Sequence, residues 1–102
     1  MNTAPLQPVE ASPLAAPLAA WLNRVVILDT MGPFIYIGTL SEIHGHVLIL
    51  IEADVHDSTD SSSTKEFYIA RTRELGVHSN RDIVAVQRQH VVSISPLDAV
   101  QI

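Results

Sequence analysis

The stretch FIYIGTLSEIHGHVLILIEADV, residues 34–55, decides the fold. It holds two runs rich in aliphatic and aromatic residues, 34–43 and 47–55, which are separated by the short polar segment His44-Gly45-His46. Such runs are typical of β-strands, and a glycine between polar residues is typical of a tight reversal. The sequence therefore predicts a β-hairpin. Gly38, inside the first run, indicates a sharp bend in that strand.

The same reading extends to the rest of the chain. Leu18, Trp21 and Leu22 recur at helical spacing and predict a short helix over residues 16–23. Further β-like runs predict strands at residues 25–28, 67–72, 83–87 and 90–95. Five or six short strands with no second helix pattern are typical of an all-β barrel or sandwich.

Length and composition predict a single domain of 102 residues, 47% hydrophobic and 17% charged. We expect residues 1–13 to be a flexible tail rich in proline and alanine, and residues 14–102 to form the barrel. Residues 57–64, made only of Asp, Ser and Thr, predict an exposed loop. The chain has no cysteine, which excludes disulfides, zinc–thiolate sites and cysteine nucleophiles.

Charge and targeting signals narrow the function classes. The formal net charge of −5 argues against nucleic acid held by long-range electrostatics. The first 23 residues lack the basic region and the unbroken apolar run of a secretory signal. The apolar run Val47–Ile51 is far shorter than the ~20 residues that cross a bilayer. We therefore expect a cytoplasmic protein without a membrane partner.

The central strands are apolar on both faces, whereas a sheet with one wet face alternates apolar and polar residues. The short helix covers only part of the second face, and another copy of the chain is the simplest cover for the rest. The sequence therefore predicts a homo-oligomer. Its core and oligomer strands are represented by Ile35, Ile37, Leu48 and Leu50.

The order of a helix, bent strands and a last strand after a tight break resembles the Sm-like small barrel of Sm, LSm and Hfq proteins. The resemblance covers residues 14–95. Gly32, Gly38, Leu40 and the run 49–51 match the first Sm motif, a turn glycine followed by G-x-L and an apolar run. Residues 86–94 follow the apolar spacing of the second motif, I-R-G-x-x-V-x-x-I. The resemblance implies an SH3-like barrel of five or six strongly bent antiparallel strands, assembled in a ring.

The chain departs from the family at the pocket that holds RNA. The family's aspartate falls at His44, its asparagine near Leu48, and its Arg-Gly pair at Gln87 and Arg88. In RNA-binding members these residues hold a base by stacking and by hydrogen bonds to its Watson–Crick edge. The chain is thus similar to a divergent Sm-like protein that lacks the usual pocket residues.

Arginines offer a different surface for RNA. Arg71 and Arg73 would share one face of the strand predicted at 67–72, and Arg88 and His90 lie at the break before the last strand. Repeated around a ring, these residues would form a local surface for phosphate or RNA. The alternative is a solvated charge mosaic in which Glu66, Glu74 and Asp82 pair with the arginines.

His44 and His46 raise the hypothesis of a metal site. On extended backbone the two imidazoles would point to the same side, and Asp54 and His56 of the following strand are candidate further ligands. The alternative is a polar hairpin tip with exposed histidines.

Taken together, these patterns predict a non-enzymatic Sm-like oligomeric scaffold, with a non-standard arginine surface as its candidate contact with RNA. A protein-interaction or structural homo-oligomer without a nucleic-acid role is the alternative, and a metal-binding oligomer using His44 and His46 is a third. Nucleophile, base and oxyanion donor do not occur in a recognisable pattern, so no catalytic residue and no cofactor are expected.

Overall fold

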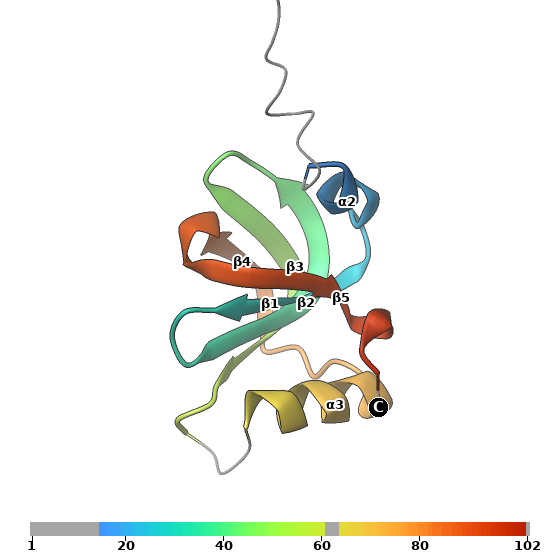
Figure 1. Ribbon diagram of the computed structural model, residues 1–102, viewed down its shortest axis with the longest axis vertical. Coiled ribbons are helices and arrows are strands. Elements are labelled where there is room, and N and C mark those ends of the chain that lie inside the picture. The colour runs from blue at the N-terminus through green and yellow to red at the C-terminus, as the bar shows by residue number, and fades with distance from the viewer. Residues whose placement is uncertain (1–14, 61–63, 102) are drawn as a thin grey trace, which may run out of the picture.

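A computed structural model describes residues 15–60 and 64–101 (Figure 1). The tail expected at residues 1–13 lies outside them. Five strands form one antiparallel sheet in the order β4-β3-β2-β1-β5. They are β1 (Val25–Thr30), β2 (Phe34–Ile43), β3 (Val47–Asp57), β4 (Arg81–Gln87) and β5 (Val91–Pro96). The predicted fold, a short N-terminal helix and a bent five-stranded barrel, is confirmed.

The helices lie at both ends of this barrel. Helix α2 (Ala15–Ala20) precedes β1, and helix α3 (Lys65–Leu75) connects β3 to β4. Two 3-10 turns, Arg88–His90 and Leu97–Ala99, precede and follow β5. No helix among the described residues is long and apolar enough to span a membrane.

The predicted hairpin is β2–β3, and its first strand has the predicted bounds. The register pairs Ile43 with Leu48 at the turn and Phe34 with Asp57 at the far end. It shifts between Ile37 and Thr39, on either side of Gly38. A shift of this kind bends a strand and increases its twist. The bend curls the sheet into the barrel seen in Figure 1.

Two hydrophobic clusters occupy the two faces of the curled sheet. The first fills the barrel and includes the fully buried side chains of Leu28, Leu48 and Leu50, with Trp21 packed against it. The second lies on the outer face and is built on Ile27, Ile35 and Ile37. The central strands are therefore apolar on both faces because each face packs against a different cluster.

The prediction of a strand at residues 67–72 is wrong, because this segment belongs to helix α3. Thr64 caps the helix: its Oγ1 accepts a hydrogen bond from the backbone N–H of Phe67 at 3.1 Å. Gly76 ends it, with a positive φ of 95° and its N–H donated to the carbonyl of Thr72 at 2.8 Å. Caps at both ends thus select a helix despite the β-like run of Phe67, Tyr68 and Ile69.

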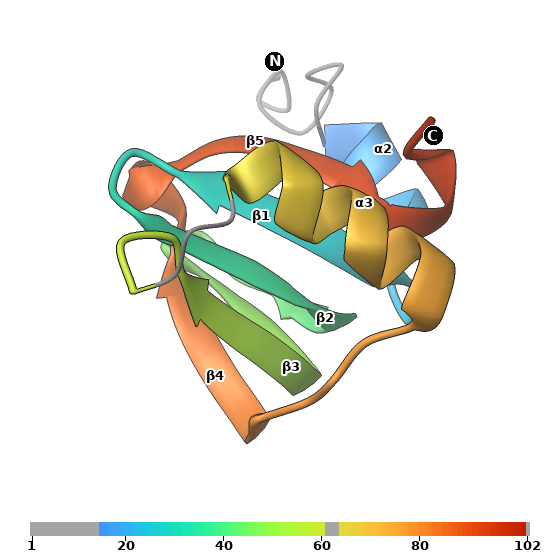
Figure 2. The ribbon, with the colours of Figure 1, turned by 90° about the horizontal axis from the view of Figure 1, so that it is seen from below.

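Helix α3 covers the second apolar face of the sheet, as Figure 2 shows. Tyr68 and Ile69 pack against the outer cluster, as do Val77 and the C-terminal residues Leu97 and Val100. We expected another copy of the chain to pack on this face, but the outer cluster is packed against residues of the same chain. The doubly apolar strands thus no longer argue for an oligomer.

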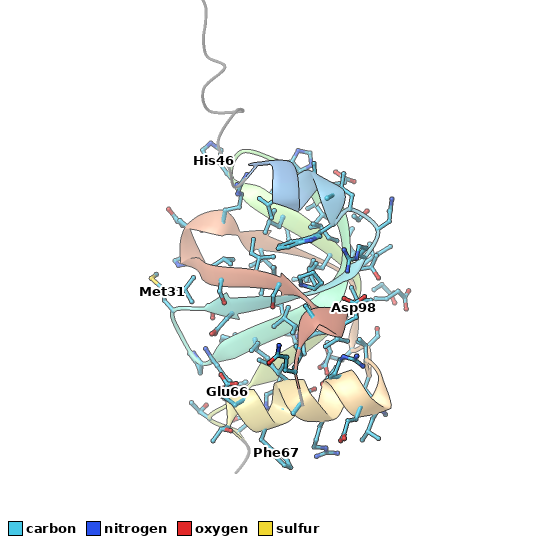
Figure 3. All side chains as sticks on the ribbon, turned by 45° about the vertical axis from the view of Figure 1, so that its right-hand side comes forward. Met31, His46, Glu66, Phe67 and Asp98 are labelled. Carbon is cyan, nitrogen blue, oxygen red and sulfur yellow. The ribbon has the colours of Figure 1, made fainter. Side chains whose placement is uncertain are left out.

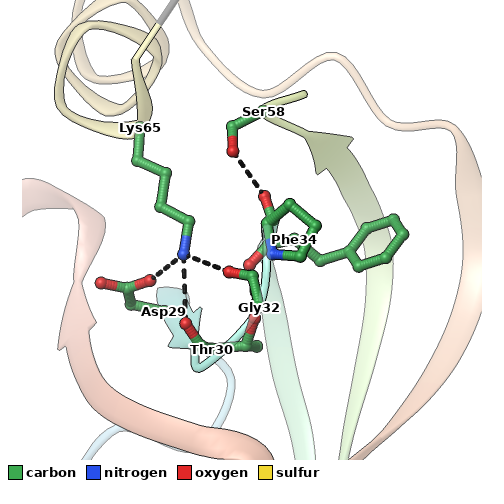
Figure 4. A network of polar contacts seen from close by, with 7 residues as sticks. Asp29, Thr30, Gly32, Phe34, Ser58 and Lys65 are labelled. Carbon is green, nitrogen blue, oxygen red and sulfur yellow. Dashed lines mark hydrogen bonds and ion pairs between the residues drawn. The ribbon is translucent and has the colours of Figure 1, made fainter. Parts of the chain in front are cut away.

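One lysine joins the start of α3 to the β1–β2 turn (Figure 4). The Lys65 ammonium donates to Asp29 Oδ1 at 2.7 Å, to the Thr30 carbonyl at 3.1 Å and to the Gly32 carbonyl at 2.7 Å. An ammonium has three donors, so all of them are used. Ser58, in the loop after β3, adds a hydrogen bond from its Oγ to the Pro33 carbonyl at 2.9 Å.

Candidate nucleic-acid interface

The β2–β3 turn and the β4–β5 connection meet at one end of the barrel. They are brought together by the pairing of β3 with β4, in which Val47 lies opposite Gln87. The two segments line a cleft of about 370 Å³, with Gly45, His46 and Val47 on one side and Gln87, Arg88 and Gln89 on the other. Two segments that lie about forty residues apart in the sequence therefore form one site, which includes the side chains of His46 and Arg88.

Arg88 is the central cation of this cleft. Its backbone N–H donates to the His46 carbonyl at 2.9 Å, and its Nη1 donates to the His44 carbonyl at 2.8 Å. A guanidinium has five N–H donors in a fixed plane, so this bond orients the group and leaves other donors for a ligand. Arg88 was a predicted site residue, but the sequence did not indicate that the two histidines lie beside it.

The two histidines have different surroundings. His44 Nε2 lies 2.7 Å from Glu42 Oε1 in an exposed pair, and His46 is exposed at the tip of the barrel (Figure 3). Asp54 and His56, the candidate further metal ligands, pair with Ile37 and Ile35 at the other end of the hairpin.

Among the described residues no three His, Cys, Asp or Glu side chains are grouped to hold a metal ion. The metal site at His44 and His46 gains no support from this geometry and stays a prediction.

His90 faces a different cleft from Arg88. It lines a hollow of about 210 Å³ together with Phe34 and Tyr36 of β2, whose ring centroids are 6.4 Å apart. The His90 carbonyl accepts a hydrogen bond from the Met31 N–H at 3.0 Å, which holds the β1–β2 turn against the connection. The predicted pair of Arg88 and His90 is thus divided between neighbouring hollows.

Arg71 and Arg73 lie on α3, away from Arg88, and not on the predicted strand face. Figure 3 shows His46 at one end of the molecule and Phe67 at the other. The Arg71 guanidinium lies 6.0 Å from the centroid of the Phe67 ring. The single arginine surface expected from the sequence is therefore not formed within one chain.

The ion pairs of the described residues do not include the expected partners Glu66, Glu74 and Asp82. They join Arg24 to Asp98, His44 to Glu42 and Lys65 to Asp29. The predicted pairing of Glu66, Glu74 and Asp82 with the arginines is therefore not found among the described residues.

The four residues predicted for the core and for oligomer contacts are all buried within a single copy of the chain. Ile35 and Ile37 lie under α3, and Leu48 and Leu50 lie in the barrel, each with no exposed surface. They position the hairpin that carries the cleft and are not available to a second copy.

A buried polar cluster beneath α3 was missed by the sequence analysis. The buried carboxylate of Asp54 accepts hydrogen bonds from the Tyr68 hydroxyl and, at 3.2 Å, from Asn80 Nδ2. The His56 ring stacks on Tyr68 with centroids 3.7 Å apart. Burial, followed by the hydrogen bond to Asp54, raises the pKa of the Tyr68 hydroxyl well above its ordinary value. These contacts anchor α3 and lie outside the cleft.

A scan against protein-family models finds no match for this chain, and a search of curated proteins finds none either. Solved structures do match. The chain is similar to the Sm protein of Pyrococcus abyssii, solved in complex with a uridine heptamer, at 18% identity and a TM-score of 0.57; the match covers 83% of this chain and 97% of that one. It is also similar to the SmAP1 heptamer of P. aerophilum, at 21% identity and a TM-score of 0.58, covering 83% and 93%.

A chain of the NatC complex bound to CoA is a third structural neighbour. It is 18% identical with a TM-score of 0.50, and the match covers 78% of this chain and 82% of that one. Together with the five-stranded sheet and the N-terminal helix, these similarities show that the protein has an Sm-like fold. The resemblance stated from the sequence motifs is confirmed at the level of the fold.

Proposed function

We propose that this chain is a non-enzymatic Sm-like scaffold that assembles with itself and holds single-stranded RNA in the cleft around Arg88. The observation that carries the proposal is the convergence of Arg88 with the turn of His44 and His46 at one cleft. The structural neighbour solved with a uridine heptamer supports the choice of ligand. The cytoplasm is the compartment we propose for it.

The groups of the cleft suit a strand with splayed bases. Sequence-specific recognition of RNA targets unpaired bases, which stack on aromatic side chains, histidine included, or on arginine planes. Here the exposed imidazole of His46 and the guanidinium of Arg88 offer such surfaces. Gln89 Nε2 donates to Gln87 Oε1 at 3.0 Å, which leaves Gln87 Nε2 and Gln89 Oε1 for base edges. The guanidinium also suits a phosphate. Because the chain as a whole is acidic, binding depends on these local groups and not on long-range attraction.

The proposal for self-assembly rests on the two edges of the sheet. Strands β4 and β5 are the outer strands and are not paired with each other among the described residues. Each carries an exposed aliphatic side chain, Ile83 at 62% and Val92 at 59%. Unpaired edges of this kind are templates for pairing with another chain. If β4 of one copy pairs with β5 of the next, the contact is heterologous and closes into a ring when the rotation allows.

The test is fluorescence anisotropy of an end-labelled oligouridine titrated with the protein. We expect saturable binding by the native chain and a loss of affinity of about tenfold or more in Arg88→Gln, since charge-assisted hydrogen bonds are about 1.5–3 kcal/mol each. Arg81→Gln, at the opposite end of β4, is the matched control and should stay within about twofold. Absence of binding by the native chain, or equal losses in both variants, contradicts the proposal.

The second candidate function is a protein-interaction oligomer without RNA. It is favoured by an apolar cleft of about 280 Å³ between α2 and β5, lined among others by Leu18, Trp21 and Val92. A multimer that fails to bind either oligouridine or oligoadenine would favour this alternative.

A further inference from the structure

A second cationic cleft lies away from the proposed RNA site. It has a volume of about 280 Å³ and is lined by Arg24 and Val25 at the start of β1, Arg73 in the last turn of α3, and Leu97 and Asp98. Asp98 and His46 lie well apart in Figure 3, so the two clefts are separate places on the molecule. Two of the chain's six basic residues therefore converge where the proposed function does not use them.

Arg73 has donor capacity that the chain itself does not use. Its Nε is buried and has no hydrogen-bond partner among the described residues. This Nε has almost no open surface, so an anion in the cleft would be bound by the terminal nitrogens of Arg73. The acceptor that suits the planar donors of a guanidinium best is an oxyanion.

Arg24 forms an exposed ion pair with Asp98. Its Nη2 lies 2.9 Å from Asp98 Oδ1, but the two side chains are 44% and 71% exposed. An ion pair this exposed is screened by water and is readily exchanged for another anion. The cleft therefore presents two guanidinium groups against one solvated carboxylate.

We propose that Arg24 and Arg73 form a site for a phosphate monoester, with the two guanidinium groups holding the phosphate oxygens. Two cations match a dianion better than they match a single carboxylate, and arginine is suited to bidentate binding of phosphate. Val25 and Leu97 line the same cleft and provide apolar surface for the organic group that carries the phosphate. The source is either a free phosphorylated metabolite or the terminal phosphate of an RNA strand.

The test is isothermal titration calorimetry of the full chain with phenyl phosphate, with benzoate as the carboxylate counterpart. We expect saturable binding of phenyl phosphate, weaker binding of benzoate, and a loss of affinity of about tenfold in both Arg24→Gln and Arg73→Gln. Arg71→Gln removes a charge from the exposed side of the same helix and should stay within about twofold. Arg24→Gln alters an exposed side chain, so the test stands even if Arg73→Gln fails to fold.

Three outcomes would overturn the proposal. They are absence of saturable binding, benzoate binding as tightly as phenyl phosphate, and an equal loss in Arg71→Gln, which would indicate diffuse electrostatics. Oligouridine with and without a 5′-phosphate distinguishes the sources, because only a terminal-phosphate site prefers the phosphorylated strand. Arg88→Gln should leave phenyl phosphate binding unchanged, so this proposal can fail or succeed independently of the RNA cleft.

Discussion

At the scale of the residue, Gly38 permits a close approach between β2 and β3. A Cβ at this position would lie 2.9 Å from both the Cα and the Cβ of Ala53 and 3.1 Å from the Ile51 carbonyl oxygen. Since backbone atoms cannot turn away as a flexible side chain can, Gly38→Ala should lower the free energy of unfolding by about 1–3 kcal/mol. Urea unfolding followed by circular dichroism measures it.

Gly32→Ala is the matched control for this substitution. A Cβ at Gly32 meets nothing within 4 Å, so the variant should stay within about 0.5 kcal/mol of the native chain. Equal stability of the two variants would contradict the close packing at Gly38.

Because of Tyr68, the free energy of unfolding of the chain should depend on pH in the alkaline range. Burial and the Asp54 carboxylate raise the pKa of its hydroxyl above the ordinary 10.0, so the folded chain keeps a proton that the unfolded chain loses. Stability is therefore fully present below about pH 10 and falls as the pH rises toward the folded-state pKa. Tyr68→Phe should be less stable by about 1–3 kcal/mol at neutral pH, because Asp54 loses a donor.

The measurement is the free energy of unfolding of both proteins between about pH 8 and pH 12, a range that brackets the ordinary tyrosine pKa of about 10. The difference between native chain and Tyr68→Phe should narrow above about pH 10. A difference that stays constant over this range would show that Tyr68 keeps an ordinary pKa.

At the scale of the element, α3 shows where sequence reasoning failed and why. The run Phe67, Tyr68 and Ile69 has high β-propensity, and the choice between helix and strand was made on it alone. The signals for a helix were present, with Thr64 at the N-cap and Gly76 at the C-terminal end. The first strand of the hairpin, at 34–43, was predicted with its bounds because propensity and turn chemistry agree there.

The candidate site was predictable only in part. Arg88 was predicted as a site residue because it is a cation at the break before the last strand, but its neighbours in the cleft depend on the register of β3 against β4, which pairs Val47 with Gln87. No local pattern encodes a pairing between strands that lie so far apart in the chain. Arg73 was grouped with Arg71 because residues 67–72 were predicted as a strand, whereas the helix brings Arg73 to the cleft that Arg24 lines.

Lys65 tests the attachment of α3 to the barrel. Lys65→Met keeps most of the side-chain length but loses the three hydrogen bonds to the β1–β2 turn, and should lower the free energy of unfolding by about 1–2 kcal/mol. Arg71→Met, on the same helix and exposed, should change it by less than about 0.5 kcal/mol. Equal effects in thermal or urea unfolding would show that the lysine contributes only its charge.

For the whole molecule, we propose that copies of the chain assemble through the edges of the sheet. Ile83→Asp places a charge on the exposed side of β4 and should reduce the multimer to smaller species in light scattering, since a buried unpaired charge is strongly unfavourable. Leu75→Asp changes a side chain on α3 that is just as exposed, at 67%, and should leave the mass unchanged. If Leu75→Asp dissociates the multimer and Ile83→Asp does not, copies meet through α3.

We propose that copies of this chain assemble and together hold single-stranded RNA at the Arg88 cleft. Native mass spectrometry of the untagged protein mixed with a short oligouridine tests assembly and RNA binding at once. We expect one discrete multimer that carries RNA, and the loss of that RNA in Arg88→Gln without loss of the multimer. A monomer at micromolar concentration, or a multimer that carries no RNA, would overturn the proposal.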